Sequence, residues 1–367
     1  GSPMQLSQHT ELHRRRGGRR LAWADVAFGM MAGSDASKPE SLEFRLLESA
    51  RSTWMADIGN QLGLLLLGDC HKGTVSSADD SAFAPEWMRV TEAAAAAASH
   101  RKPPASSLQW RCYRQSVRRG SSLWRKTLAL LRGIFDLFPE RELALKVDID
   151  TIVLPRPLLL YLRFLQEARG GISPLYFGNG GRVVHRGLFC WGAHCLFRTE
   201  SWASLLRQHN WTDEQRHQIR GQQLAYAAGG LYGFNRAALA RLAAPGARCM
   251  EAAAATVTSY RDAGHRIAHL AEDEVVGLCM LALRVRLITC DCFYQYGPCD
   301  CHNVSGSCAD GTRDSRLCRL PLSIHKVKRV AWYLPWWRAL IGREALYLAE
   351  AAGGARARAG TTGERLR

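Results

Sequence analysis

The sequence predicts an α/β fold whose central sheet is mostly parallel and flanked by helices. Three observations support it: two apolar runs of strand length, an amphipathic helical pattern between them, and a third apolar run that ends in two acids. Continuous apolar runs bounded by turn residues are typical of parallel strands, because helices cover both of their faces. The strand–helix–strand order adds the crossover that parallel strands need, so we expect a Rossmann-like sheet.

The first half of the chain supplies most of this pattern. The expected elements are a strand over 21–30 that ends near Gly29, a helix over 42–55, a strand over 62–69, a helix over 124–138 and a strand from 143. Residues 71–108 are rich in Ser, Ala and Pro, which indicates a loop. An alanine run over 93–98 predicts a short helix within that loop.

The character of the chain changes after Pro157. The expected elements here are a helix over 158–167, a glycine-rich loop over 170–181, a Gly229-Gly230 turn, a helix over 236–242 and a helix over 271–283. The last helix begins with acids, which a helix N-terminus favours. We therefore divide the chain into a disordered basic leader over 1–20, one domain over 21–330 with halves 21–157 and 158–330, and a C-terminal helix and mobile tail over 331–367.

Two acids, Asp148 and Asp150, end the apolar run that begins at Leu143. Ligands of open α/β sheets bind outside the carboxyl ends of the strands, so these carboxylates stand at the mouth of a crevice. Residues two apart on an extended chain share a face, where two negative charges repel unless a cation lies between them. Carboxylate oxygens suit Mg²⁺ or Mn²⁺, which commonly bridge to nucleotide phosphates, so we interpret the pair as a metal–nucleotide site. The ordinary alternative is a pair of solvated acids at a strand end.

The chain is strongly basic, with a formal net charge of +16 from 49 Lys and Arg against 33 Asp and Glu. Nucleic acid, an anionic membrane surface and an acidic substrate would all suit such a charge. No nucleic-acid motif and no basic helix interleaved with aromatic residues accompanies it, so we expect no nucleic-acid partner. No run reaches the roughly 18–20 apolar residues of a membrane span.

Cysteines crowd into a loop that is rich in Gly, Asp and Ser: Cys290, Cys292, Cys299, Cys301, Cys308 and Cys318. Zinc is one option, but its usual spacing leaves two to four residues between paired cysteines, and the close pairs here leave one. The even total of 12 cysteines and the loop setting favour disulfides in an oxidising compartment. Two glycosylation sequons, which begin at Asn210 and Asn303, also suit a secretory route.

Five short motifs follow one another in a particular order. They are Ala50-Arg51-Ser-Thr-Trp54, Lys146-Val-Asp-Ile-Asp150, Gly229-Gly230 with Tyr232, Glu272-Asp273 with Gly277, and Ser323-Ile-His325-Lys-Val-Lys328. This order resembles the β-1,3-glycosyltransferase family that includes Fringe and the core 1 galactosyltransferase. Arg-x-Thr-Trp, Lys-x-Asp-Asp-Asp, Gly-Gly-Gly-Tyr, Glu-Asp-Val-x-x-Gly and His-x-Val-Lys recur in that family. The resemblance covers about residues 21–330, with unmatched insertions near 71–108 and 170–220.

The resemblance implies a GT-A fold, an inverting transfer from a nucleotide sugar, and a Mn²⁺ or Mg²⁺ cofactor. By motif match, Asp150 and His325 would be the metal ligands and Asp148 would face the nucleotide or its sugar. Asp273 would be the general base, and an acceptor hydroxyl that gives its proton to a positioned carboxylate reacts ~10²–10⁴-fold faster. A divalent ion would stabilise the charge that develops on the diphosphate leaving group. The ordinary alternatives are a core histidine and an acid at a helix N-terminus.

The same motif match places Arg51 and Lys146 near the donor. It also implies that Gly229 and Gly230 let the backbone approach the substrate closely, whereas the alternative for these glycines is a plain turn. Four aromatic residues are candidates for stacking on sugar faces, although core packing is the commoner role of such side chains: Trp191, Trp202, Trp211 and Tyr232.

The sequence therefore predicts a metal-dependent, inverting β-1,3-glycosyltransferase of the Golgi lumen that acts on a glycan or glycoconjugate. UDP-galactose is the expected donor and UDP-N-acetylglucosamine the next one to consider. The rival hypothesis is a family member without turnover that serves as a lectin-like or chaperone subunit. The joint presence of Asp150, His325 and Asp273 disfavours that rival, because an inactive homologue has no chemical need for all three. The opening Gly-Ser-Pro-Met is typical of a cloning remnant, so we expect a type II membrane protein whose N-terminal anchor has been removed.

Overall fold

The computed structural model describes residues 20–33, 40–69, 88–89, 107–113, 123–169, 173–182, 200–216, 225–244, 247–262, 271–290, 292–294, 321–342 and 344. Nearly all of the expected leader, the short helix over 93–98, most of the cysteine-rich loop and the tail after 344 lie outside these residues. None of the described helices is both long enough and apolar enough to cross a membrane.

The helices and strands alternate through much of the described chain. The strands are β1 (Val26–Met31), β2 (Gly63–Asp69), β3 (Met88–Arg89), β4 (Ser107–Tyr113), β5 (Leu143–Asp148), β6 (Ile152–Val153), β7 (Tyr176–Arg182), β8 (Ala225–Asn235), β9 (Leu287–Thr289), β10 (Phe293–Tyr294) and β11 (Ser323–Ile324). The helices are η1 (Trp23–Asp25), α2 (Leu42–Arg51), α3 (Trp54–Ile58), η3 (Gly59–Gln61), α5 (Leu123–Leu137), α6 (Pro155–Arg169), α8 (Glu200–Gln208), α10 (Arg236–Ala243), α11 (Cys249–Asp262), α12 (Glu272–Ala282) and a C-terminal helix over 330–342.

The described strands form one large sheet and one small sheet. The large sheet has the order β3-β4-β2-β1-β5-β8-β7-β9, and the small one has the order β10-β11-β6. Strands β4, β2, β1 and β5 are parallel to their neighbours in this series, β8 is antiparallel to β5 and β7, and β9 is parallel to β7. The predicted α/β class with a mostly parallel central sheet is confirmed.

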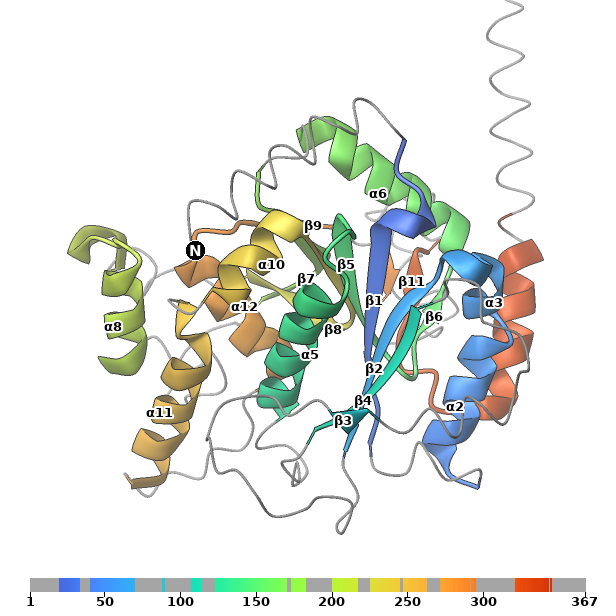
Figure 1. The fold of residues 1–367 in the computed structure, drawn as a ribbon, viewed down its shortest axis with the longest axis horizontal. Helices are drawn as coiled ribbons and strands as arrows, with labels where there is room; N and C mark the ends of the chain where they lie inside the picture. Colours follow the sequence, from blue (N-terminus) through green and yellow to red (C-terminus); the bar gives the residue numbers. More distant parts are fainter. Residues whose placement is uncertain are drawn as a thin grey trace, which may run out of the picture.

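Helices cover both faces of the large sheet (Figure 1). Helices α5, α10 and α12 pack on one face, and α2, α3, α6 and the C-terminal helix pack on the other. Side chains of β1 alternate between the two cores, with Ala27 in the first and Phe28 in the second. A strand that is buried on both faces needs apolar residues at every position, which explains the unbroken apolar run of β1.

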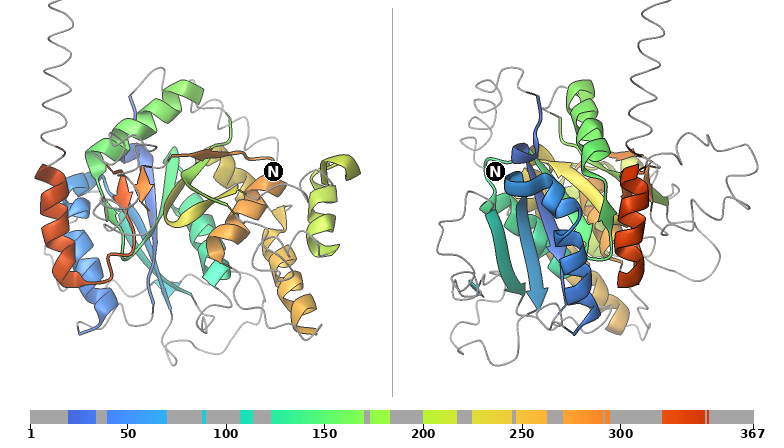
Figure 2. Two further views of the ribbon diagram at one scale, coloured as in Figure 1. Left: turned by 180° about the vertical axis from the view of Figure 1, so that it is seen from behind. Right: turned by 90° about the vertical axis from the view of Figure 1, so that its right-hand side faces the viewer.

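The C-terminal helix lies beside α2 and α3 (Figures 1 and 2). Its inner face carries Tyr333, Trp337 and Leu340, which are buried in the same core as Phe28. These three side chains recur every three or four residues, which is the period of one helix face. The helix is therefore part of the packed domain that contains β1.

The helix that we expected over 42–55 is two helices, α2 and α3, with a break at Ser52 and Thr53. The hydroxyl of Thr53 donates a hydrogen bond to the backbone oxygen of Ser49, at 2.6 Å. Threonine side chains that bond the backbone locally compete with regular helix geometry.

Two glycine-rich stretches that we expected to be a loop and a turn are strands. Strand β7 occupies part of 170–181, and Gly229 and Gly230 lie inside β8. At Gly178, an added Cβ would lie 2.8 Å from the Cβ of Ala227 and 2.9 Å from that of Tyr232 on the neighbouring strand. Glycine is present there because two strands approach closely, so composition alone misled the prediction. Strand β4 likewise replaces the end of the expected loop over 71–108.

Cys290 and Cys292 form a disulfide, in agreement with the preference for disulfides in this loop. Cys249 and Cys279 are free, buried thiols. The other cysteines of the loop lie outside the described residues, so their pairing stays a prediction.

Candidate active site

The candidate site lies at the carboxyl end of β5, where Asp148 is the last residue of the strand. The chain turns there, and the backbone N–H of Thr151 donates to the oxygen of Asp148 at 3.0 Å. Strand β11 pairs antiparallel with β6, which follows that turn directly. One residue beyond β11 is His325, so this pairing brings a residue from the end of the domain against the acids of its first half.

Three side chains meet at this point. Nε2 of His325 lies 3.2 Å from Oδ2 of Asp148 and 3.2 Å from Oδ1 of Asp150. One ligand atom from each residue lies within 4.8 Å of the other two. Two carboxylate oxygens and an imidazole nitrogen are a donor set that fits a divalent cation, and hard ions such as Mg²⁺ and Mn²⁺ prefer the oxygens. The structure thus brings together the two predicted metal ligands and adds Asp148 to them.

The charges of this group are strongly coupled. Burial alone would lower the pKa of His325, but hydrogen bonds to Asp148 and Asp150 outweigh it and raise the pKa to about 9. Burial would raise the pKa of Asp148, but the charges of Lys146 and His325 outweigh it and hold that pKa below its usual value. Without a metal ion, a proton on His325 therefore supplies the positive charge between the two carboxylates.

Gly230 determines how closely β8 can pass the imidazole. A Cβ built on Gly230 would lie 2.4 Å from both Cβ and Cγ of His325. Nδ1 of His325 is buried and has no hydrogen-bond partner among the described residues, so close packing rather than a second hydrogen bond orients the ring. At Gly230 the backbone lies close to the side chain of His325, and the predicted approach of the two glycines to a substrate stays a prediction.

Lys146 is fully buried behind the acids. Its Nζ lies 2.6 Å from Oδ1 of Asp148, 2.5 Å from Oε1 of Glu272 and 2.8 Å from the backbone oxygen of Gly229. A lysine ammonium has three N–H donors, and these three oxygens use all of them. Burial would lower the pKa of Lys146, but the charges of Asp148 and Glu272 outweigh it and raise the pKa. In this structure Lys146 forms ion pairs with Asp148 and Glu272, and its predicted contact with a nucleotide-sugar donor stays a prediction.

The start of α12 carries two adjacent acids with different surroundings. Oδ2 of Asp273 accepts the backbone N–H of Gly229 at 3.0 Å, and Oδ1 accepts that of Glu274 at 2.9 Å. Burial raises the pKa of Asp273, with the N–H of Gly229 as an opposing effect. Burial also raises the pKa of Glu272, to about 7, although the charge of Lys146 opposes it. Asp273 is thereby linked to Asp148 of β5 through Gly229 and Lys146.

Sequence reasoning gave Glu272 no role, although it named the Glu-Asp pair. The signal for it in the sequence is the lysine in the apolar run of β5, since a buried ammonium needs an acceptor for each of its three N–H groups. Arg51 is exposed and pairs with Glu48 on its own helix, so its place near a donor stays a prediction.

Of the aromatic candidates for sugar stacking, Trp202 and Tyr232 are fully buried, and core packing is their role. The ring of Tyr232 lies 5.2 Å from Nζ of Lys146, where it faces the buried charge. Trp211 is half-buried and donates its Nε1–H to the backbone oxygen of Ala282. Trp191 lies outside the described residues.

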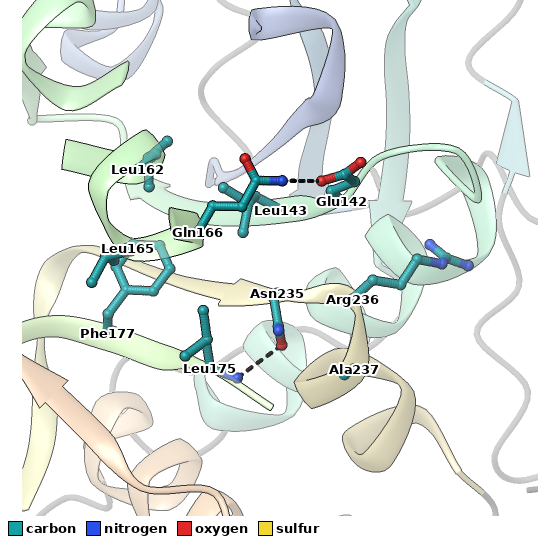
Figure 3. A pocket seen from close by; sticks show the side chains of 10 residues that line it. All are labelled: Glu142, Leu143, Leu162, Leu165, Gln166, Leu175, Phe177, Asn235, Arg236 and Ala237. Carbon is teal, nitrogen blue, oxygen red and sulfur yellow. Dashed lines mark hydrogen bonds between the residues drawn. The ribbon is translucent and has the colours of Figure 1, made fainter. Parts of the chain in front are cut away.

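A pocket lies at the opposite, amino end of β5 (Figure 3). Its polar groups are already paired, since Gln166 donates to Glu142 at 2.7 Å and the N–H of Leu175 donates to Asn235 at 2.8 Å. It contains none of the acids or the histidine described above. We therefore place the chemistry at the carboxyl end of the strand.

No known family model matches this chain, and no curated protein matches its sequence. Among solved structures, it is similar to the galactosyltransferase LgtC in complex with donor and acceptor sugar analogs, with 11% identity, 86% of this chain and 96% of that chain covered, and a TM-score of 0.41. It is also similar to apo mouse xyloside xylosyltransferase 1, with 11% identity, coverage of 82% and 97%, and a TM-score of 0.38. An active-site mutant of LgtC gives 13% identity, coverage of 82% and 86%, and a TM-score of 0.39. Similarities this weak establish neither a family nor a function for this chain.

Replacement of Lys146 should test the buried ion pairs. Lys146→Met removes the ammonium from Glu272 and from the partly buried Asp148, and we expect it to lower the free energy of unfolding by about 3–5 kcal/mol. Urea denaturation measures this loss. The double variant Lys146→Met/Glu272→Gln should lose less than the sum of the single variants, and strict additivity would contradict the coupling.

His325 should make the stability of the metal-free protein depend on pH. Its pKa in the folded chain is about 9, above the ordinary 6.5, so its stabilisation is fully present below pH 6.5 and is lost as the pH rises through about 9. In EDTA, we expect the wild-type chain to lose roughly 3 kcal/mol across this range and His325→Asn to lack that step. Urea denaturation at several pH values measures both free energies of unfolding. If these change with pH in the same way in the two proteins, His325 is not the group responsible.

Proposed function

We propose that this protein is a metal-dependent, inverting glycosyltransferase of the GT-A type that uses a nucleotide sugar as donor. The single observation that best supports the proposal is the meeting of Asp148, Asp150 and His325 at the carboxyl end of β5. Carboxylates at that edge of an open α/β sheet are where ligands of such sheets bind. A divalent ion held there by Asp150, His325 and Asp148 would stabilise the negative charge of a departing diphosphate.

The acids on α12 supply the second requirement of the reaction. An acceptor hydroxyl becomes a good nucleophile when a positioned carboxylate accepts its proton. We assign this role to Asp273, whose pKa is raised by burial and whose carboxylate is oriented by the N–H of Gly229. Direct displacement with inversion needs one base and one stabilised leaving group, so no covalent nucleophile is required.

The finer assignments depend on the motif resemblance. We propose UDP-galactose as the donor, with UDP-N-acetylglucosamine as the next candidate, a β-1,3 linkage as the product, and Mn²⁺ as the ion. A glycan or glycoconjugate would be the acceptor. The disulfide between Cys290 and Cys292 and the exposed Asn210 of a sequon support a place in the secretory pathway, and we propose the Golgi lumen.

Removal of a metal ligand should weaken Mn²⁺-dependent binding of UDP. We expect Asp150→Asn and His325→Asn each to raise the dissociation constant by at least about tenfold, measured by calorimetry with and without Mn²⁺. Asp136→Asn is the matched control, because Asp136 lies in an exposed ion pair on α5. If both site variants keep the wild-type affinity for UDP in Mn²⁺, the proposed metal site is wrong.

Removal of the base should affect transfer without affecting binding. Asp273→Asn keeps the shape of the side chain, and we expect it to bind UDP and Mn²⁺ as the wild-type chain does while the transfer rate falls ~10²–10⁴-fold. Radiolabel transfer from a panel of nucleotide sugars measures the rate, with Asp136→Asn again as the control. Normal transfer by Asp273→Asn would exclude Asp273 as the base. If the wild-type chain binds glycans but turns over no donor, the lectin-like alternative is favoured.

A further inference from the structure

Three segments that are far apart in the sequence are joined by a buried hydrogen-bond chain beside the candidate site. Nε1 of Trp54 donates to the hydroxyl of Tyr333 at 3.1 Å, and this hydroxyl donates to the backbone oxygen of Thr151 at 2.9 Å. All three residues have no exposed surface. Trp54 belongs to α3, Tyr333 to the C-terminal helix, and Thr151 follows Asp150 directly.

The turn that carries the acids is held at further points. The hydroxyl of Thr151 donates to the backbone oxygen of Gly230 at 3.2 Å, and the N–H of Val327 donates to the backbone oxygen of Asp150 at 2.9 Å. Both carbonyl oxygens of the Asp150-Thr151 pair are thus bonded by the segment that contains His325. That segment also contains Tyr333, eight positions further along the chain.

We propose that Tyr333 is a positioning residue for the metal site: its hydroxyl ties the acid turn to α3 and to the C-terminal helix and so sets the separation between Asp150 and His325. This inference rests on the proposed metal site. By this inference the C-terminal helix helps to position the site, although the sequence analysis placed it outside the catalytic domain.

Loss of the Tyr333 hydroxyl should be costly because its hydrogen bonds are buried. Water cannot replace a lost partner at positions without exposed surface, so removal of the hydroxyl would leave the N–H of Trp54 and the carbonyl of Thr151 unsatisfied. The least costly response is a shift of the acid turn, since β6 is only two residues long and its partner β11 is equally short. A shift there moves Asp150 relative to His325, and residues that orient metal ligands in this way commonly affect affinity 10–100-fold when changed, by the general behaviour of outer-shell partners.

The test is the affinity for Mn²⁺ alone, measured by electron paramagnetic resonance on the whole chain. Tyr333→Phe removes only the hydroxyl, and we expect its dissociation constant for Mn²⁺ to rise about tenfold. Thr256→Val is the control, because it removes a fully buried hydroxyl from α11, on the other face of the sheet, and should leave Mn²⁺ affinity unchanged. Both variants should lose stability to a similar degree.

An unchanged Mn²⁺ affinity in Tyr333→Phe, with the same loss of melting temperature as in Thr256→Val, would show a merely structural hydroxyl and overturn the inference. If Tyr333→Phe does not fold, Trp54→Phe tests the same tie by removing the N–H that donates to the Tyr333 hydroxyl, and unchanged affinity there would overturn the inference as well. A wild-type chain that does not bind Mn²⁺ would instead refute the proposed function itself. The two failures are therefore distinguishable.

Discussion

The buried ammonium of Lys146 is the interaction on which the rest of the site depends. It joins β5 through Asp148, β8 through the oxygen of Gly229, and α12 through Glu272. A cation without exposed surface is tolerated only when oxygens satisfy all of its donors, and here three oxygens from three elements do so. The position of the strand end is thereby fixed relative to the helix that carries Asp273. Loss of the Lys146 ammonium would therefore free both Asp148 on β5 and Glu272 on α12 from their ion pairs.

A second constraint is the way in which the end of the domain closes over this strand. Strand β11 pairs with β6 directly after the turn that follows β5, and Val327 and Tyr333 each bond that turn. Gly230 leaves just enough room for His325 beside β8. Every contact in this set involves backbone atoms of the turn, of β6 or of β8. The candidate metal ligands are therefore held in place through contacts to the main chain.

The sequence predicted the parts of the fold that depend on local pattern. The apolar runs of β1, β2 and β5 and the acidic start of α12 each correspond to an element of the structure. Strands β7 and β8, which each contain paired glycines, escaped prediction because some of these glycines reflect contacts between strands, as at Gly178, and such contacts have no local signature. The group of Asp150 and His325 was predicted from the resemblance, whereas the roles of Glu272, Thr151 and Tyr333 arise from tertiary contacts that no spacing in the sequence encodes.

The two acids on α12 have different surroundings, which bear on the choice of Asp273 as the proposed base. Glu272 has an oxygen 2.5 Å from the ammonium of Lys146, so this carboxylate is already engaged in a buried ion pair. Asp273 instead accepts two backbone N–H groups, and each of its oxygens keeps a second lone pair for a proton. Proton transfer to Asp273 thus leaves the ion pairs of Lys146 intact. The two adjacent carboxylates thus have different partners: Glu272 pairs with the lysine, whereas Asp273 keeps the capacity to accept a proton that the base proposed above requires.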